Sequence, residues 1–160
     1  MSEMKEAQKA VDEVYSEMKS FIDRTVEIYL KDTNEVIKRL EDGLFELSNE
    51  DVRSAIVELS LKAYRLSDIK EKSALKAELA ETIRKSMYSS VFNETGGSVA
   101  VRENNATISV NSEILVEKTY DSIASTLKTK LDEIHRVVDA LKSVLVSRLS
   151  EEKLAVSQTM

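Results

Sequence analysis

The 160-residue sequence predicts an all-α protein whose long helices pack as an antiparallel bundle or coiled coil. It contains no proline and only three glycines, so few residues would interrupt a helix. Aromatic residues make up 5% and charged residues 32%, a balance typical of long helices rather than of sheets. The third observation is an apolar repeat near the C-terminus, which keeps alternating three- and four-residue gaps.

The first expected element is a long helix over residues 4–40, within an N-terminal segment 1–47. Apolar residues recur there at helical spacing from Met4 to Leu40, and the register weakens at 31–34, where the expected apolar position is polar. Gly43 is expected to end the helix through a left-handed cap. The acidic residues are interpreted as a solvated face, with an acidic partner surface as the alternative.

The second expected element is a basic middle helix, or a pair of helices, over residues 48–93. Ser48 and Asp51 have the spacing of a capping box, which predicts a helix start at this point. Ser67 and Asp68 have the residue types of a second N-cap, so a break remains open. The expected interior positions are Val52, Ile56, Leu59, Ala63, Leu66, Ala74, Ala77 and Ala80.

A turn and a short connector are expected over residues 94–111. Asn93–Gly97 is the clearest turn signal in the chain. Residues 98–110 have two interpretations: a hairpin around Asn104, or a short helix that begins after Ser98 and runs to about Thr107. Propensity favours the hairpin, but an isolated two-stranded ribbon is only marginally stable, so the short helix is slightly preferred.

The last expected element is a heptad helix over residues 112–155, within a single helical domain 1–160. Its apolar positions need a partner helix, and a second row at Ile123, Val137 and Val144 widens the face beyond a two-stranded zipper. We expect this face to assemble a homo-oligomer. The heptad seam comprises Tyr120, Ala124, Leu127, Leu131, Ile134, Val138, Leu141 and Leu145.

No catalytic, cofactor or metal constellation is visible, so an enzyme is the least favoured class and no cofactor is expected. The chain has no cysteine and a single histidine, His135, and it lacks a phosphate-binding glycine motif. No segment has the apolar length of a signal core or a membrane span, so we expect no membrane association and a cytoplasmic protein, of the host cell if phage-encoded.

The net charge of −6 is distributed unevenly along the chain. Residues 1–55 hold 8 basic and 14 acidic residues, residues 56–95 hold 7 and 6, and residues 96–160 hold 8 and 9. An acidic total argues against strong nonspecific DNA binding by a monomer, although a local basic track remains compatible with it.

Such a track is present in the middle segment. Arg65, Lys72 and Lys76 are spaced at i, i+7 and i+11, so they lie on one side of a helix. Lys62 lies about 60° away around the same helix. Cations so placed would span several phosphates of a single strand. The alternative is that they lie beside an apolar contact face formed by Ile69, Leu79 and Ile83. Tyr88 and Phe92, four residues apart, also allow two interpretations: their rings stack on nucleic-acid bases, or they pack in the protein core.

The segment Ala74-Leu-Lys-Ala-x-Leu79 resembles the DNA-binding segment of UvsY-type phage recombination mediators. Lys76 matches a basic position of that family, Lys70 and Lys72 lie in the corresponding upstream basic stretch, and Glu78 stands where the family has a second basic residue. The general layout, with a glycine turn and a C-terminal assembly helix, is also similar. The resemblance implies a helical oligomer that binds single-stranded DNA and helps load a RecA-type recombinase onto strands covered by single-strand-binding protein.

The leading hypothesis is therefore a single-stranded DNA-binding recombination accessory protein that uses Lys62, Arg65, Lys70, Lys72 and Lys76. The alternative is a coiled-coil structural, scaffold or adaptor protein with protein partners only. A third hypothesis is an acidic inhibitor that mimics nucleic acid through residues 1–55.

Overall fold

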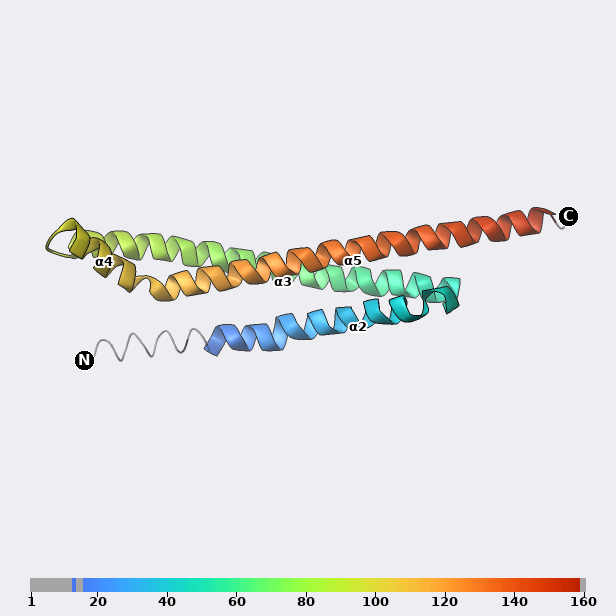
Figure 1. Ribbon diagram of the computed structural model, residues 1–160, viewed down its shortest axis with the longest axis horizontal. Helices are drawn as coiled ribbons and strands as arrows, with labels where there is room; N and C mark the ends of the chain where they lie inside the picture. The colour runs from blue at the N-terminus through green and yellow to red at the C-terminus, as the bar shows by residue number, and fades with distance from the viewer. Residues whose placement is uncertain (1–12, 14–15, 159–160) are drawn as a thin grey trace. The chain divides into compact units, whose positions relative to one another are not determined.

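The computed structural model describes residue 13 and residues 16–158 of the chain (Figure 1). After helical residues 16–21, the elements are a π-helical segment η1 (Ile22–Val26), α2 (Glu27–Gly43), a 3-10 turn η2 (Leu44–Glu46), α3 (Asn49–Glu94), α4 (Val99–Ser109) and α5 (Asn111–Gln158). The described residues contain no strand. The predicted all-α class is confirmed.

The middle and last elements are the two long helices drawn in green and in orange to red in Figure 1. α3 runs without a break through Ser67 and Asp68, so one continuous helix occupies the segment for which a helix pair was the alternative. Residues 99–109 form a helix rather than a hairpin, as the sequence slightly favoured. None of the helices in the described part of the chain is long and apolar enough to cross a membrane.

The chain divides into two compact units, and both long helices contribute to each. Unit 1 contains residues 1–26 and 69–126, and unit 2 contains residues 27–68 and 127–160. The start of the expected first helix, including Met4, lies outside the described residues.

Unit 2 is built from α2, the first part of α3 and the later part of α5. Its buried interior includes Val36 and Leu40 of α2, Leu59 and Leu66 of α3, and the seam positions of α5 from Leu127 to Leu141. Polar contacts link the helices at their edges, where Arg39 Nη2 of α2 donates to Glu58 Oε2 of α3 at 3.0 Å.

A polar residue interrupts the apolar face of α2 without breaking the helix. Thr33 is fully buried, and its Oγ1 donates to the carbonyl of Tyr29 at 2.7 Å. A buried hydroxyl that is hydrogen-bonded to its own helix leaves no unsatisfied donor. This explains why the sequence register weakens at 31–34 while α2 continues to Gly43.

The end of α2 differs from the expectation. Gly43 has φ −144°, outside the left-handed region, so the predicted left-handed cap is wrong. The turn is instead fastened by Arg148 of α5, whose Nη1 and Nη2 donate to the carbonyls of Leu47 and Leu44 at 2.7 and 3.1 Å. Carbonyls left free at a helix end are often satisfied in this way by a basic side chain.

Unit 1 contains residues 16–26, the later part of α3, α4 and the first part of α5. After Ile69, its buried α3 positions are small: Ser73, Ala77 and Ala80. Small side chains allow the backbones of neighbouring helices to approach closely. Arg84 Nε of α3 donates to Glu117 Oε2 of α5 at 2.6 Å, which fixes these two helices at their edge.

Candidate interaction surface on α3

α3 carries apolar residues on two opposite faces. One face is buried and includes Val52, Leu59, Ala63, Leu66, Ala77 and Ala80, which were expected to be interior; Ile56 and Ala74 are half-buried. The opposite face bears six large apolar side chains that are 43–77% exposed. We call these six residues the outer stripe: Val57, Leu61, Tyr64, Leu75, Leu79 and Ile83.

The outer stripe follows the helix closely. Its members fall within an arc of about 100° on the helical wheel, opposite the buried face, and extend over about 39 Å at 1.5 Å per residue. Asp68 and Lys72 lie on the same arc in the middle of the stripe. Beyond its two ends the arc is polar, with Ser54 before Val57 and Ser86 after Ile83. The apolar surface is therefore bounded.

Side-chain size makes the outer stripe unusual in unit 1. There the buried α3 positions after Ile69 are Ser73, Ala77 and Ala80, whereas Leu75, Leu79 and Ile83 are exposed. Burying a leucine or isoleucine is favourable by about 1.5–3 kcal/mol relative to leaving it exposed. A helix that directs its larger apolar side chains to solvent retains this free energy for contact with another molecule.

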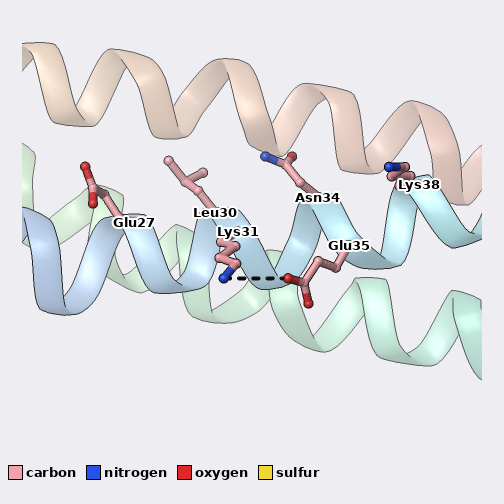
Figure 2. A pocket seen from close by; sticks show the side chains of 6 residues that line it. All are labelled: Glu27, Leu30, Lys31, Asn34, Glu35 and Lys38. Carbon is pink, nitrogen blue, oxygen red and sulfur yellow. Dashed lines mark ion pairs between the residues drawn. The ribbon is translucent and has the colours of Figure 1, made fainter.

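Two shallow hollows lie along the helices of unit 2. One is lined by Glu50, Arg53, Ser54, Val57, Glu58 and Leu61, and so includes the beginning of the outer stripe. Figure 2 shows the other, whose six lining residues all come from α2 and include the exposed ion pair between Lys31 and Glu35. Each hollow is formed along a single helix, so both are surface grooves rather than enclosed cavities for a small ligand.

The five predicted DNA-binding cations have different surroundings. The ammonium of Lys62 is paired with Asp32 of α2 and lies 3.8 Å from Glu58, and only 12% of its side chain is exposed. Lys70 pairs with the adjacent Glu71 at 2.8 Å. In their described positions both ammonium groups are matched with carboxylates of the same chain, which weakens their attraction for phosphate.

Lys76 is engaged by aromatic rings in unit 1. Its Nζ lies 4.7 Å from the ring centre of Phe21 and 5.0 Å from that of Tyr120, and it donates to the Tyr120 hydroxyl at 3.3 Å. Phe21 and Tyr120 also contact each other, with ring centres 5.8 Å apart. Lys76 therefore has a packing role through cation–π contacts.

Arg65 and Lys72 are exposed and lie two turns apart on the same side of α3. The helix that carries them has no net charge, because α3 contains 8 basic and 8 acidic residues. Local partners shift the pKa values of two of these charged side chains. The hydrogen bond from Lys85 lowers the pKa of Glu81, and the hydrogen bond to Glu117 raises the pKa of Arg84. Both shifts favour the charged forms.

Ile69 and an aromatic pair near the end of α3 have other surroundings. Ile69, expected beside the cations, lies one turn from both Arg65 and Lys72 and is buried at the edge of the buried face of α3, so the cations do flank an apolar contact residue. Tyr88 and Phe92 are half-buried and stack on each other with ring centres 6.2 Å apart. The guanidinium of Arg102 lies 5.3 Å from the Phe92 ring centre, so this pair packs against α4 within unit 1.

The heptad seam of α5 lies inside the chain. Tyr120, Leu127, Leu131, Ile134, Val138 and Leu141 are buried, and Ala124 and Leu145 are half-buried. The residues proposed from sequence for oligomerisation therefore form core contacts within one chain. A second copy could reach them only if the helices separated, whereas the outer stripe is accessible without any rearrangement.

Sequence reasoning did not single out Val57, Leu61, Tyr64 and Leu75 as a contact surface. Their signal was present, because the positions 57, 61, 64, 68, 72, 75, 79 and 83 repeat with gaps of 4, 3 and 4, an 11-residue period. Among the described residues, no group of three or more acidic or histidine side chains has a metal-binding arrangement. Comparisons with protein-family models, curated proteins and solved structures found no match.

Proposed function

We propose that this chain is a nonenzymatic structural or adaptor protein that works by binding protein through the outer stripe of α3. The observation that supports the proposal is the row of six large, exposed apolar side chains on one side of a continuous helix. Large apolar side chains that share one exposed face, here as two groups of three on either side of Asp68 and Lys72, mark contact sites in soluble proteins. An apolar helix face recognises another protein by fitting its side chains against a complementary helix or groove.

The proposal is tested by co-purification from the native host, with protein pairs then reconstituted from purified components. Leu61→Glu and Leu79→Glu together should abolish capture of a partner, because two carboxylates would be placed within the apolar contact. Ala140→Glu, at an exposed position of α5, is the matched control and should retain capture. A partner bound equally by all three proteins would contradict the assignment of the surface.

A second candidate is single-stranded DNA binding, supported by Arg65, Lys72 and the 77% exposed Tyr64 on one side of α3. Guanidinium and ammonium groups contact phosphates, and an exposed aromatic ring can stack on a base. If this candidate holds, the family resemblance implies a role in loading a RecA-type recombinase onto DNA covered by single-strand-binding protein.

The second candidate is tested by titrating a fluorescent single-stranded oligonucleotide at two salt concentrations. Binding should weaken steeply with salt, and Arg65→Ala with Lys72→Ala should reduce both the affinity and the salt dependence. Lys128→Ala, at an exposed position of α5, should leave both unchanged. If no binding occurs at low salt, the DNA candidate is wrong while the protein-binding proposal stands.

A further inference from the structure

The outer stripe has a similar order of residue types when α3 is followed in either direction. Positions whose residue numbers add to 140 have matching chemistry: Val57 with Ile83, and Leu61 with Leu79. Near the centre of this relation, Asp68 corresponds to Lys72. A two-fold axis brings residue i of one copy opposite residue j of the other and, equally, j opposite i. The stripe therefore has the symmetry that an isologous contact requires.

We infer that the outer stripe binds a second copy of this chain, with the two α3 helices antiparallel and crossing near residue 70. This inference rests on the proposed protein-binding function and names the occupant of the surface. In this register Val57 meets Ile83, Leu61 meets Leu79, and Tyr64 meets the Leu75–Lys76 step of the other copy. Every large apolar residue of the stripe is then covered by an apolar neighbour or by an aliphatic stem.

Charge distinguishes the antiparallel arrangement from a parallel one. Antiparallel helices place Asp68 opposite Lys72 on both sides of the axis, so opposite charges meet twice. Parallel helices in register would place Asp68 against Asp68 and Lys72 against Lys72, and like charges in such positions are destabilising. Both residues already have an interaction within the chain, and the pairing does not require either to be without a partner.

The 11-residue period supports the same geometry. A heptad repeat gives a left-handed supercoil, whereas 11 residues over three turns drift by about 20° in the opposite sense and give a right-handed one. Two α3 helices with this repeat remain in contact from Val57 to Ile83 if they wind slightly around each other with a right-handed twist. The contact ends at Ser54 and Ser86, which face each other in this register, so the apolar seam is flanked by polar residues at both ends.

Disulfide trapping tests the register directly, because the chain contains no cysteine. The double variant with Leu61→Cys and Leu79→Cys should form a covalent dimer on mild oxidation, closed by two disulfides. The two cysteines of one chain are about 27 Å apart along the helix, too far to join within that chain. The single variants should cross-link much more slowly, since each cysteine faces a leucine of the other copy.

Mass measurement on the unmodified protein completes the test. Light scattering or sedimentation equilibrium should give a species of twice 18.0 kDa, and Leu79→Glu should return it to a monomer while Ala140→Glu should not. Rapid cross-linking of Leu61→Cys alone would overturn the antiparallel register. If the wild type remained a monomer at all concentrations, the inference that a second copy binds the outer stripe would be wrong. If such a monomer still captured a partner in the experiment above, the proposed function would stand without this inference.

Discussion

Ser48 and Asp51 fix the first turn of α3 through reciprocal hydrogen bonds. The Ser48 amide and hydroxyl both donate to Asp51 Oδ2, at 3.1 and 2.6 Å, and the Asp51 amide donates back to Ser48 Oγ at 3.1 Å. The capping box predicted from sequence is confirmed. The hydrogen bonds from Ser48 lower the pKa of Asp51 below its ordinary value.

Ser48→Ala should therefore lower the free energy of unfolding by about 1 kcal/mol, the usual cost of losing an N-cap hydroxyl. Urea denaturation measures this change. Ser54→Ala, at an exposed position within the same helix, is the matched control and should have little effect or a slightly stabilising one. Equal stabilities for the two variants would show that the cap does not contribute.

The cap should also depend on pH. Because the pKa of Asp51 is lower in the folded chain than in the unfolded chain, its contribution is fully present above the unfolded value of about 3.9 and is lost as pH falls through the folded value. The stability difference between wild type and Ser48→Ala should consequently shrink below about pH 4. An NMR titration should find the pKa of Asp51 closer to its ordinary value in Ser48→Ala.

Gly97 controls the turn between α3 and α4. Its φ is +107°, which side chains disfavour, whereas Gly96 has no positive φ. An added Cβ at Gly97 would lie 3.6 Å from the side chain of Val101, an ordinary contact, so the cost of substitution comes from the backbone. Gly97→Ala should lower the free energy of unfolding by about 1–3 kcal/mol. Gly96→Ala should change it much less, and similar melting temperatures for the two would refute this explanation.

At the scale of elements, the two faces of α3 have different roles, and Leu59 and Leu61 separate them. Leu59 is fully buried and Leu61 is on the outer stripe, only two residues further along the same helix. Leu59→Ala should lower the free energy of unfolding of the monomer by about 2–5 kcal/mol, because it leaves a cavity in the core. Leu61→Ala should leave monomer stability nearly unchanged and should weaken association.

This contrast is measured by denaturation of dilute protein together with mass measurement of concentrated protein. Each variant is the control for the other, since both remove the same atoms from the same helix. If Leu61→Ala destabilised the dilute monomer as strongly as Leu59→Ala, the outer stripe would be part of the core. If neither variant affected association, the stripe would not be the contact surface.

The same contrast explains how far the sequence predicts this fold. α5 has a continuous apolar seam, so its buried positions could be read from spacing alone. α3 has apolar residues on opposite faces, so periodicity does not say which face is buried. In unit 1 the choice depends on packing: Ala77 and Ala80 face inward while Leu79 faces outward, against the simple expectation that larger apolar residues are buried.

The candidate site could be predicted only in part for a related reason. Spacing placed Arg65 and Lys72 correctly on one side of α3, but it could not show that Lys62 pairs with Asp32 from another helix. Nor could it show that Lys76 meets Phe21 and Tyr120, which are distant in sequence. A residue's local spacing defines its direction on a helix, whereas its partners depend on which helices pack together.

At the scale of the whole molecule, the inferred pairing of two copies would couple association to folding. A second copy that binds only the folded chain adds to the free energy of unfolding by mass action, and this contribution increases with protein concentration. The melting temperature of the wild type should therefore rise measurably over about a hundredfold increase in concentration. Calorimetry or circular dichroism at several concentrations measures this rise.

The variant Leu79→Glu isolates the source of that rise. Leu79 is exposed, so a carboxylate at this position stays hydrated in the monomer but would be desolvated in the paired helices. Its melting temperature should match that of dilute wild type and should stay constant with concentration, while Ala140→Glu should keep the wild-type dependence. A concentration dependence that persisted in Leu79→Glu would place the contact elsewhere on the chain, because the paired α3 helices cannot accommodate two buried carboxylates without opposing cations.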